Sequence, residues 1–148
     1  MREILFRGKS TDNGKWIEGQ YIHLHKTTYC VKEDYDAAPD NDIHQIVFEQ
    51  MTDWGLPNEH LRADIDPLTL GQFTGLTDKN NKMIFEGDIV TQPVRETRKH
   101  SPCLVEFKDG KFQAHYISKS YYYDRYYDLN SYTKIIGNIH DNPELLGE

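Results

Sequence analysis

Apolar and polar residues alternate through much of this chain, and the clearest pattern lies in its central stretch, residues 72–90. Two apolar runs, 72–76 and 83–90, flank a polar Asp-Lys-Asn-Asn turn at 78–81. Asn and Asp tolerate left-handed backbone and hydrogen-bond to their own turns, so this stretch predicts a β-hairpin. Glu86-Gly87-Asp88 interrupts the second run, and its glycine predicts a β-bulge or a sharp bend.

A second hairpin is predicted at residues 103–116, where the alternation continues on both sides of Asp109-Gly110. Asp-Gly is a strong signal for a two-residue hairpin turn. Such a turn aligns three pairs on one face: Phe107 with Phe112, Val105 with Ala114, and Cys103 with Tyr116. The other face is polar, so we expect one buried and one solvated face.

Weaker patterns predict the remaining elements. Period-two alternation favours strands at residues 2–7, 16–25, 27–32, 45–49 and 134–140. Asn58 favours a short helix over 58–62, and Asp66 followed by Pro67 favours one helical turn over 66–70. A second Glu-Gly pair, Glu18-Gly19, predicts another β-bulge or sharp bend, and a bulge there would let Ile17, Ile22 and Leu24 all face the core.

Together these elements predict a mainly β fold of antiparallel hairpins forming a small barrel-like core, with one or two very short helices. The 148 residues fit a single domain, because chains of this size bury roughly 68–70% of their unfolded surface. A division into an N-terminal and a C-terminal β unit would fall near residues 52–70, where glycine and proline interrupt the alternation.

The charge of the chain limits its partners. Lys and Arg number 17 and Asp and Glu 24, which gives a formal net charge of −7 and a pI near 5.4. Binding to nucleic acid without sequence preference depends on neutralising phosphates with Lys and Arg. The composition therefore disfavours nucleic acid as a partner, with residues 95–100 as a local basic run.

The sequence predicts neither a membrane protein nor a secreted one. No apolar run approaches the roughly 18 residues that a membrane helix needs. Residues 1–8 alternate charged and apolar side chains, unlike a signal peptide. Cys30 and Cys103 lie far apart in strand-like runs and are expected to be reduced core thiols. We therefore expect a cytoplasmic protein.

Candidate chemistry is sparse. His23 and His25 share one face of a predicted strand, but a zinc site needs three or four ligands and the spacing places no third one. Glu86 and Asp88 resemble an acid–base pair, although carboxylates at turns are usually structural. The sequence contains no nucleophile elbow and no glycine-rich phosphate loop. It therefore predicts no catalytic residue, no metal and no cofactor.

A tyrosine-rich segment at residues 118–132 is the most unusual feature. Its clustered rings can fill a β core, form a protein interface, or stack on nucleobases. We rank these alternatives in that order, because the net charge disfavours the third. The candidate interface residues are Tyr121, Tyr122, Tyr123, Tyr126 and Tyr127.

Several motifs resemble the signature of the YopX family of phage and prophage proteins. They are Gln-Phe-Thr-Gly-Leu at 72–76 with Asp-Lys-Asn at 78–80, and Ile-Phe-Glu-Gly-Asp-Ile-Val at 84–90. Residues 1–7 and 136–146 resemble the two ends of the same family, so the resemblance covers the whole chain in order. Asn81 stands where the family turn favours Gly, and His140-Asp141 where it favours Tyr-Glu.

The resemblance implies a mainly β fold with a small barrel-like core, and it provides no catalytic residues, since the family is largely uncharacterised. Physically, the central motif is structural: a turn, a bulge and strand residues, among them Thr74, Gly75, Leu76, Glu86, Gly87 and Asp88.

Three functions remain open at this stage. The first is a phage or prophage protein in the bacterial cytosol that acts without catalysis, as a binding, regulatory or assembly module, through contacts with an unknown protein or with its own copies. The second is a nucleic-acid-associated accessory protein. The third is an enzyme whose site is assembled across strands.

Overall fold

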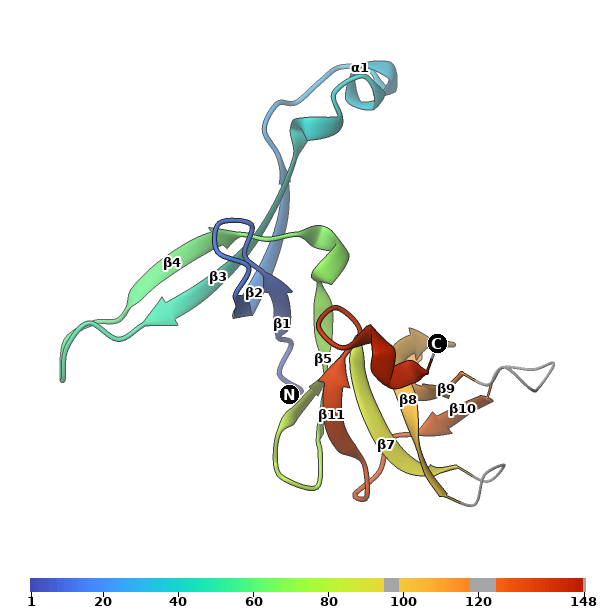
Figure 1. Ribbon diagram of the computed structural model, residues 1–148. Helices are drawn as coiled ribbons and strands as arrows, with labels where there is room; N and C mark the ends of the chain where they lie inside the picture. The colour runs from blue at the N-terminus through green and yellow to red at the C-terminus, as the bar shows by residue number, and fades with distance from the viewer. Residues whose placement is uncertain (95–98, 118–124, 148) are drawn as a thin grey trace. The chain divides into compact units, whose positions relative to one another are not determined.

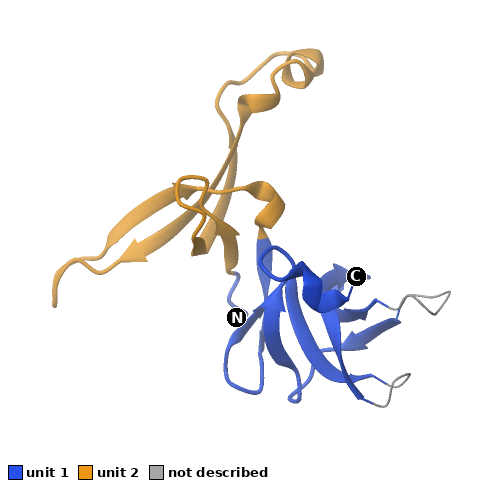
Figure 2. Ribbon diagram, in the orientation of Figure 1, with its two compact units in different colours: residues 1–4, 71–148 blue, residues 5–70 orange. Residues whose placement is uncertain are grey.

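The computed structural model describes residues 1–94, 99–117 and 125–147, and its chain divides into two compact units (Figure 2). Unit 1 comprises residues 1–4 and 71–148, and unit 2 comprises residues 5–70. Both consist mainly of antiparallel strands, which confirms the mainly β prediction. Among the described residues, no helix combines the length and the apolar character needed to cross a bilayer.

Unit 2 is organised around two long neighbouring strands (Figure 1). Its strands lie in the order β4-β3-β2-β1, with the bounds β1 (Phe6–Lys9), β2 (Trp16–His25), β3 (Asp42–Gln50) and β4 (Glu59–Asp64). The connection from β2 to β3 carries helix α1 (Lys32–Asp36) and the 3₁₀ turn η1 (Pro39–Asn41). After β4, the predicted turn at Asp66-Pro67 is confirmed as η2 (Pro67–Thr69), with the Asp66 carboxylate accepting from the Leu68 N–H.

Unit 1 contains the β5–β6 hairpin and a five-stranded sheet. The hairpin strands are β5 (Gly71–Thr77) and β6 (Met83–Phe85). The sheet has the order β10-β9-β8-β7-β11, with β7 (Asp88–Val94), β8 (Lys99–Lys108), β9 (Lys111–Tyr116), β10 (Arg125–Asp128) and β11 (Lys134–Asn138). The chain ends in the 3₁₀ turn η3 (Pro143–Leu146).

The prediction that the strands close into a small barrel is wrong. A barrel requires the first and last strands of a sheet to pair with each other. In the described residues β10 pairs only with β9 and β11 only with β7, so the five-stranded sheet stays open. The two outer strands are short, with four and five residues, and present little edge for closure.

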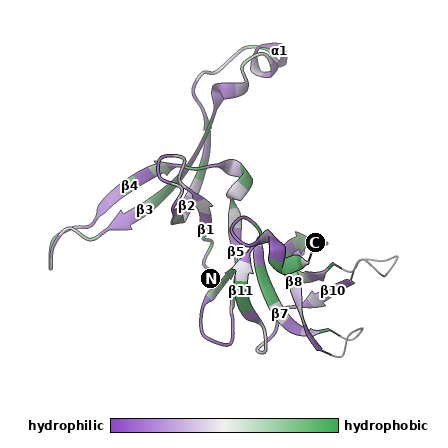
Figure 3. Cartoon of the chain, viewed as in Figure 1, coloured by the Kyte–Doolittle hydropathy of each residue, from purple (hydrophilic) through white to green (hydrophobic). Residues whose placement is uncertain are grey.

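The main hydrophobic core lies in unit 1, where Figure 3 shows hydrophobic residues along β7 and β11. Its buried members are Ile84, Val90, Val94, Cys103, Val105 and Ala114. The predicted hairpin is confirmed here, since Val105 pairs with Ala114 and Phe107 with Phe112 around Asp109-Gly110. Phe107 is 55% exposed, because its strand extends beyond the core. Burial raises the pKa of the Cys103 thiol to about 12, as expected of an inert core cysteine.

Two predicted elements of unit 2 are wrong. Residues 27–31 form no strand, because β2 pairs with β3 instead, and Cys30 is therefore exposed. The stretch predicted as a helix at 58–62 forms β4, because its alternating residues pair with β3. Propensity and a capping Asn are weak signals beside a neighbouring strand that offers a hydrogen-bonding edge.

Candidate functional site

The first half of the central motif, residues 72–76, lies in β5, where the pairing of the β5–β6 hairpin is irregular. The register shifts between the Phe73–Phe85 and Thr77–Met83 pairs, which places a bulge at residues 74–76. The buried Thr74 hydroxyl donates to the Ile84 carbonyl at 2.9 Å. Gly75 has φ +84, and an added Cβ would lie 3.1 Å from Arg2 Cδ. These contacts stabilise the bulge in β5. The first half of the motif therefore has a structural role.

The second half of the motif turns the chain from β6 into β7. Gly87 has φ +83, its N–H donates to the Val105 carbonyl at 2.9 Å, and its own carbonyl accepts from the Ile139 N–H at 2.9 Å. The Asp88 carboxylate is buried and accepts from the Phe85 N–H at 2.8 Å. Asp88 thus stabilises the turn from β6 into β7. This hydrogen bond accounts for an aspartate at position 88 without an acid–base role.

The candidate tyrosines fall into two groups. Tyr121, Tyr122 and Tyr123 lie outside the described residues. Tyr126 stacks on His115 with ring centroids 4.4 Å apart, and the Lys108 ammonium lies 4.0 Å from its ring centre. Tyr127 packs against the core of unit 1. Both described tyrosines on β10 therefore have partners within the fold.

The loop between β3 and β4, residues 51–58, presents apolar side chains to solvent, and we call it the β3–β4 tip. Trp54 is 92% exposed, Met51 69% and Leu56 59%. Trp is the largest apolar side chain and is strongly enriched at the centres of protein interfaces. Three exposed apolar residues within six positions are therefore a candidate binding surface.

The backbone of the β3–β4 tip is held by its own hydrogen bonds. The Leu56 N–H donates to the Asp53 carbonyl at 3.2 Å, and the Trp54 N–H donates to the Asp53 carboxylate at 2.7 Å. The Thr52 hydroxyl donates to the Pro57 carbonyl at 2.9 Å across the loop. The tip is thus a defined turn that presents Trp54, which reduces the ordering needed on binding.

A second candidate lies where β2 and β3 leave the rest of their sheet. The antiparallel register places His23 opposite His44 and His25 opposite Asp42. Residues two apart on a strand share a face, so all four side chains project from the same side of the ribbon. We call these four residues the histidine cluster.

Short distances connect the members of the histidine cluster. The Asp42 carboxylate lies 2.9 Å from His25 Nδ1 and 3.3 Å from His23 Nε2. The rings of His23 and His44 stack with centroids 4.5 Å apart and planes 15° apart. One potential ligand atom each from His23, Asp42 and His44 lies within 4.8 Å of the others.

The electrostatics of the cluster favour an ionised carboxylate beside a neutral phenol. The hydrogen bond from His23, supported by His25, holds the pKa of Asp42 below its ordinary value of 3.8, although partial burial opposes this. Tyr21 is hydrogen-bonded to His44 Nδ1 at 2.7 Å, and burial together with the nearby Asp42 charge raises its pKa above 10.0. Asp42 is thus an anion at neutral pH, and Tyr21 keeps its proton.

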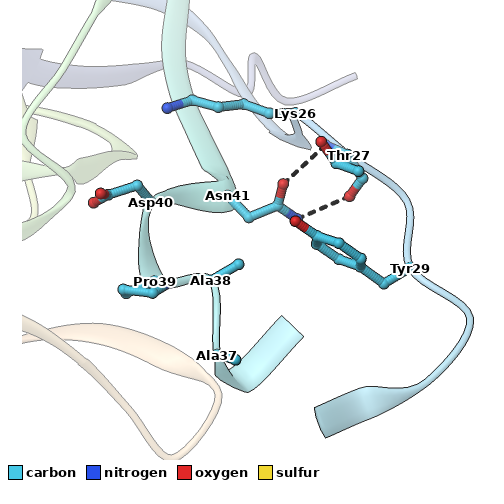
Figure 4. Close-up of a pocket in the computed structure, with 8 residues that line it drawn as sticks. All are labelled: Lys26, Thr27, Tyr29, Ala37, Ala38, Pro39, Asp40 and Asn41. Carbon is cyan, nitrogen blue, oxygen red and sulfur yellow. Dashed lines mark hydrogen bonds between the residues drawn. The ribbon is translucent and has the colours of Figure 1, made fainter. Parts of the chain in front are cut away.

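A pocket of about 410 Å³ lies beyond the cluster in the β2–β3 connection (Figure 4). The buried Asn41 side chain lines it, accepts from the Thr27 N–H at 2.8 Å and donates to the Thr27 carbonyl at 2.9 Å. The Lys26 N–H also donates to the Asn41 carbonyl at 2.8 Å. These bonds join the two ends of the connection directly after the cluster.

Comparison with known proteins identifies the family. A family model described as "YopX protein" matches residues 5–147, nearly the whole chain. The chain belongs to the YopX family. This confirms the resemblance seen in the motifs at 72–76 and 84–90, and the YopX signature therefore coincides with the bulge at Gly75 and the corner at Gly87.

A solved structure shares the fold of this YopX-family chain. The chain is similar to the crystal structure of protein EF1440 from Enterococcus faecalis. The match covers 99% of each chain, with 23% sequence identity and a TM-score of 0.51. At this identity the likeness shows the fold alone. No curated protein sequence matches the chain.

Sequence reasoning missed the histidine cluster because it assigned β2 the wrong partner. Residues 27–32 were expected to pair with β2, whereas the partner is β3, which contributes Asp42 and His44. The signal was present in the sequence, since Asp42 and His44 have the same spacing of two as His23 and His25. Recognising it required knowing which two strands are neighbours.

Proposed function

We propose that this YopX-family chain is a non-catalytic binding module that acts through protein–protein contacts, with the β3–β4 tip as the contact surface. The proposal includes its origin and location, a phage or prophage product in the bacterial cytosol. The observation that carries it is the 92% exposure of Trp54 in an internally hydrogen-bonded turn. A tryptophan so placed offers a partner a large apolar side chain at little cost in backbone ordering.

Two further features support binding over catalysis. The Glu86–Asp88 carboxylate pair, the nearest approach to an acid–base motif in the sequence, lies at a backbone corner where Asp88 accepts from Phe85. The tip, in contrast, lies within a run of twelve consecutive exposed residues, 49–60. Exposed apolar side chains grouped in this way are typical of interaction sites.

The test compares Trp54→Ala with Leu68→Ala, a control at another exposed apolar residue of the same unit. Chemical cross-linking in host lysate, with and without nuclease, should give a protein adduct that Trp54→Ala loses and Leu68→Ala keeps. Sedimentation of the purified chains shows whether that adduct is a second copy. Removal of an interface tryptophan should weaken binding by about 2 kcal/mol or more, roughly 30-fold.

Three results would argue against the proposal. The first is an adduct that both variants retain equally, because the tip would then not be the contact. The second is an adduct that disappears with nuclease, which would favour the nucleic-acid-associated alternative. The third is the absence of any adduct in the parent lysate.

A further inference from the structure

We propose that the histidine cluster binds one divalent first-row transition-metal ion through His23, Asp42 and His44, and that this ion joins β2 to β3. The ligand set is two imidazoles and one carboxylate from two neighbouring strands. Imidazole suits zinc, nickel, copper and iron, whereas magnesium and calcium prefer oxygen ligands alone. Structural zinc sites usually have four protein ligands, so water would complete the coordination of an ion held by these three.

The distances are close to those that such an ion requires. Zinc–ligand bonds of about 2.0–2.1 Å in a tetrahedron place neighbouring ligand atoms roughly 3.3 Å apart. His23 Nε2 and the Asp42 carboxylate are already 3.3 Å apart. The other separations lie within 4.8 Å, and because the His23 and His44 rings are stacked with planes 15° apart, one ring must turn out of the stack for both nitrogens to face one ion. The side chains of His23 and Asp42 are 46% and 48% exposed, so an ion can reach them.

An outer partner already orients one ligand. The Tyr21 hydroxyl occupies His44 Nδ1 at 2.7 Å, which leaves Nε2 as the atom that can face a metal. Histidines that ligate metals almost always use the second ring nitrogen for such a hydrogen bond, which fixes the ring orientation. His25, 2.9 Å from the Asp42 carboxylate, holds that carboxylate in the same way.

The position of the cluster in the sheet gives the ion a structural role. β1 pairs with β2 only up to Gly19, and β4 pairs with β3 only from Gln45 onward. Both pairs, His23–His44 and His25–Asp42, therefore lie beyond these two ladders: the His44 carbonyl still accepts from the Ile65 N–H at 3.0 Å, and the His25–Asp42 pair lies in a two-stranded extension. An isolated two-stranded ribbon is marginally stable in water. A metal bound across it would hold together the base of the connection that carries α1.

The experiment uses the untagged full chain, treated with EDTA and dialysed, on a Cys30→Ser background to remove the exposed thiol. Calorimetric titration with zinc chloride should show one ion per chain. His23→Gln and His44→Gln should each weaken binding at least tenfold, because loss of an outer partner alone costs about 10–100-fold. Tyr21→Phe should weaken it about tenfold. The control is His60→Gln, which removes an exposed histidine of β4 that lies beside Glu49 of β3; this variant should bind zinc like the parent.

A second measurement reports on the structural role. Hydrogen exchange of the amides at residues 22–26 and 41–45 should slow with zinc in the parent and not in His23→Gln. Thermal unfolding without metal checks that the variants fold. The proposal is overturned by a stoichiometry near zero, by unchanged binding in both His23→Gln and His44→Gln, by an equal loss in His60→Gln, or by exchange that zinc leaves unchanged.

Discussion

At the scale of single residues, two Glu-Gly pairs that look alike in the sequence have different physical roles. Gly87 has φ +83, a backbone conformation that favours glycine, as the predicted bend requires. Gly19 lies in a β1–β2 ladder that continues without a register shift, so the bulge predicted there is wrong. Its glycine is required because an added Cβ would collide with the Val47 carbonyl. Glycine is needed at position 87 because of its positive φ, and at position 19 because there is no room for a Cβ atom.

The first stability prediction concerns Gly87. An added Cβ would meet only Ile139 and His140 at ordinary contact distances, so the penalty comes from the backbone. A left-handed conformation costs an L-residue roughly 1–2 kcal/mol, and a β-branched residue more. Gly87→Val should therefore lower the free energy of unfolding by at least about 2 kcal/mol. Urea unfolding measures this.

Two variants accompany that measurement. Gly110→Val should also destabilise, since Asp109 and Gly110 both have positive φ in the β8–β9 turn. Gly147→Val should destabilise less than Gly87→Val: Gly147 also has positive φ (+69), but it caps the short terminal 3₁₀ turn, which can unwind locally to relieve the strain. If Gly87→Val unfolds like the parent, backbone strain does not explain this position in the YopX motif.

At the scale of elements, the turn after β5 does more than reverse the chain. The Asp78 carboxylate accepts from the N–H groups of Asn80 and Lys82 within the turn and from that of Ile135 on β11. Asn81 has φ 60, so it adopts the left-handed backbone expected at this position. One buried carboxylate thus connects the β5–β6 hairpin to the edge of the five-stranded sheet.

Stability should therefore depend on the charge of Asp78. Burial, the largest influence, raises its pKa, but the three backbone donors outweigh it and the net pKa lies below the ordinary 3.8. A carboxylate with a lowered folded-state pKa stabilises above its unfolded pKa and stops doing so as the pH falls through the folded value. Asp78→Asn should lose about 1.5–3 kcal/mol near neutral pH, the range for hydrogen bonds to charged groups.

Denaturant unfolding from pH 7 down to pH 2 tests this dependence. The stability difference between parent and Asp78→Asn should be constant at neutral pH and shrink below about pH 4, where the unfolded carboxyl begins to protonate. Asp109→Asn is the control, an exposed turn residue with φ 53 that Asn tolerates. A difference that stays the same across the whole range would show that charge is not the source of the stabilisation.

The same scale shows how much the sequence could predict. The prediction of the β8–β9 hairpin is confirmed because the alternation of apolar and polar residues on both strands and the Asp-Gly turn between them indicate the same local structure. The prediction of the Asp66-Pro67 turn is confirmed because its capping hydrogen bond, from the Leu68 N–H to the Asp66 carboxylate, joins residues only two positions apart. β4 and the β2–β3 pairing were missed because the deciding interaction is between strands far apart in the chain. The histidine cluster was missed with them, since it exists only in that register.

At the scale of the whole molecule, the buried apolar residues are distributed unevenly. Of the described buried hydrophobic residues, only Ile46 and Ile65 belong to unit 2, and the others belong to unit 1. A unit with so small a core has little apolar burial to offset the entropy of ordering its chain. Contacts that unit 2 gains from outside, through the β3–β4 tip or a metal at the histidine cluster, would therefore have a large relative effect.

Charge is the other whole-molecule property, and it leads to the last prediction. Acidic residues exceed basic ones by 24 to 17, and of the basic run at 95–100 the structure describes Lys99 and His100, both exposed. Random duplex DNA should therefore bind no more tightly than the roughly 10⁻⁴–10⁻⁶ M typical of non-specific contacts at physiological salt. Gel-shift titration at about 150 mM salt, repeated at about 50 mM, measures this affinity and its salt dependence. Sub-micromolar binding that weakens steeply with salt would mean that several phosphates are neutralised by a basic face. Nucleic acid would then replace protein as the preferred partner.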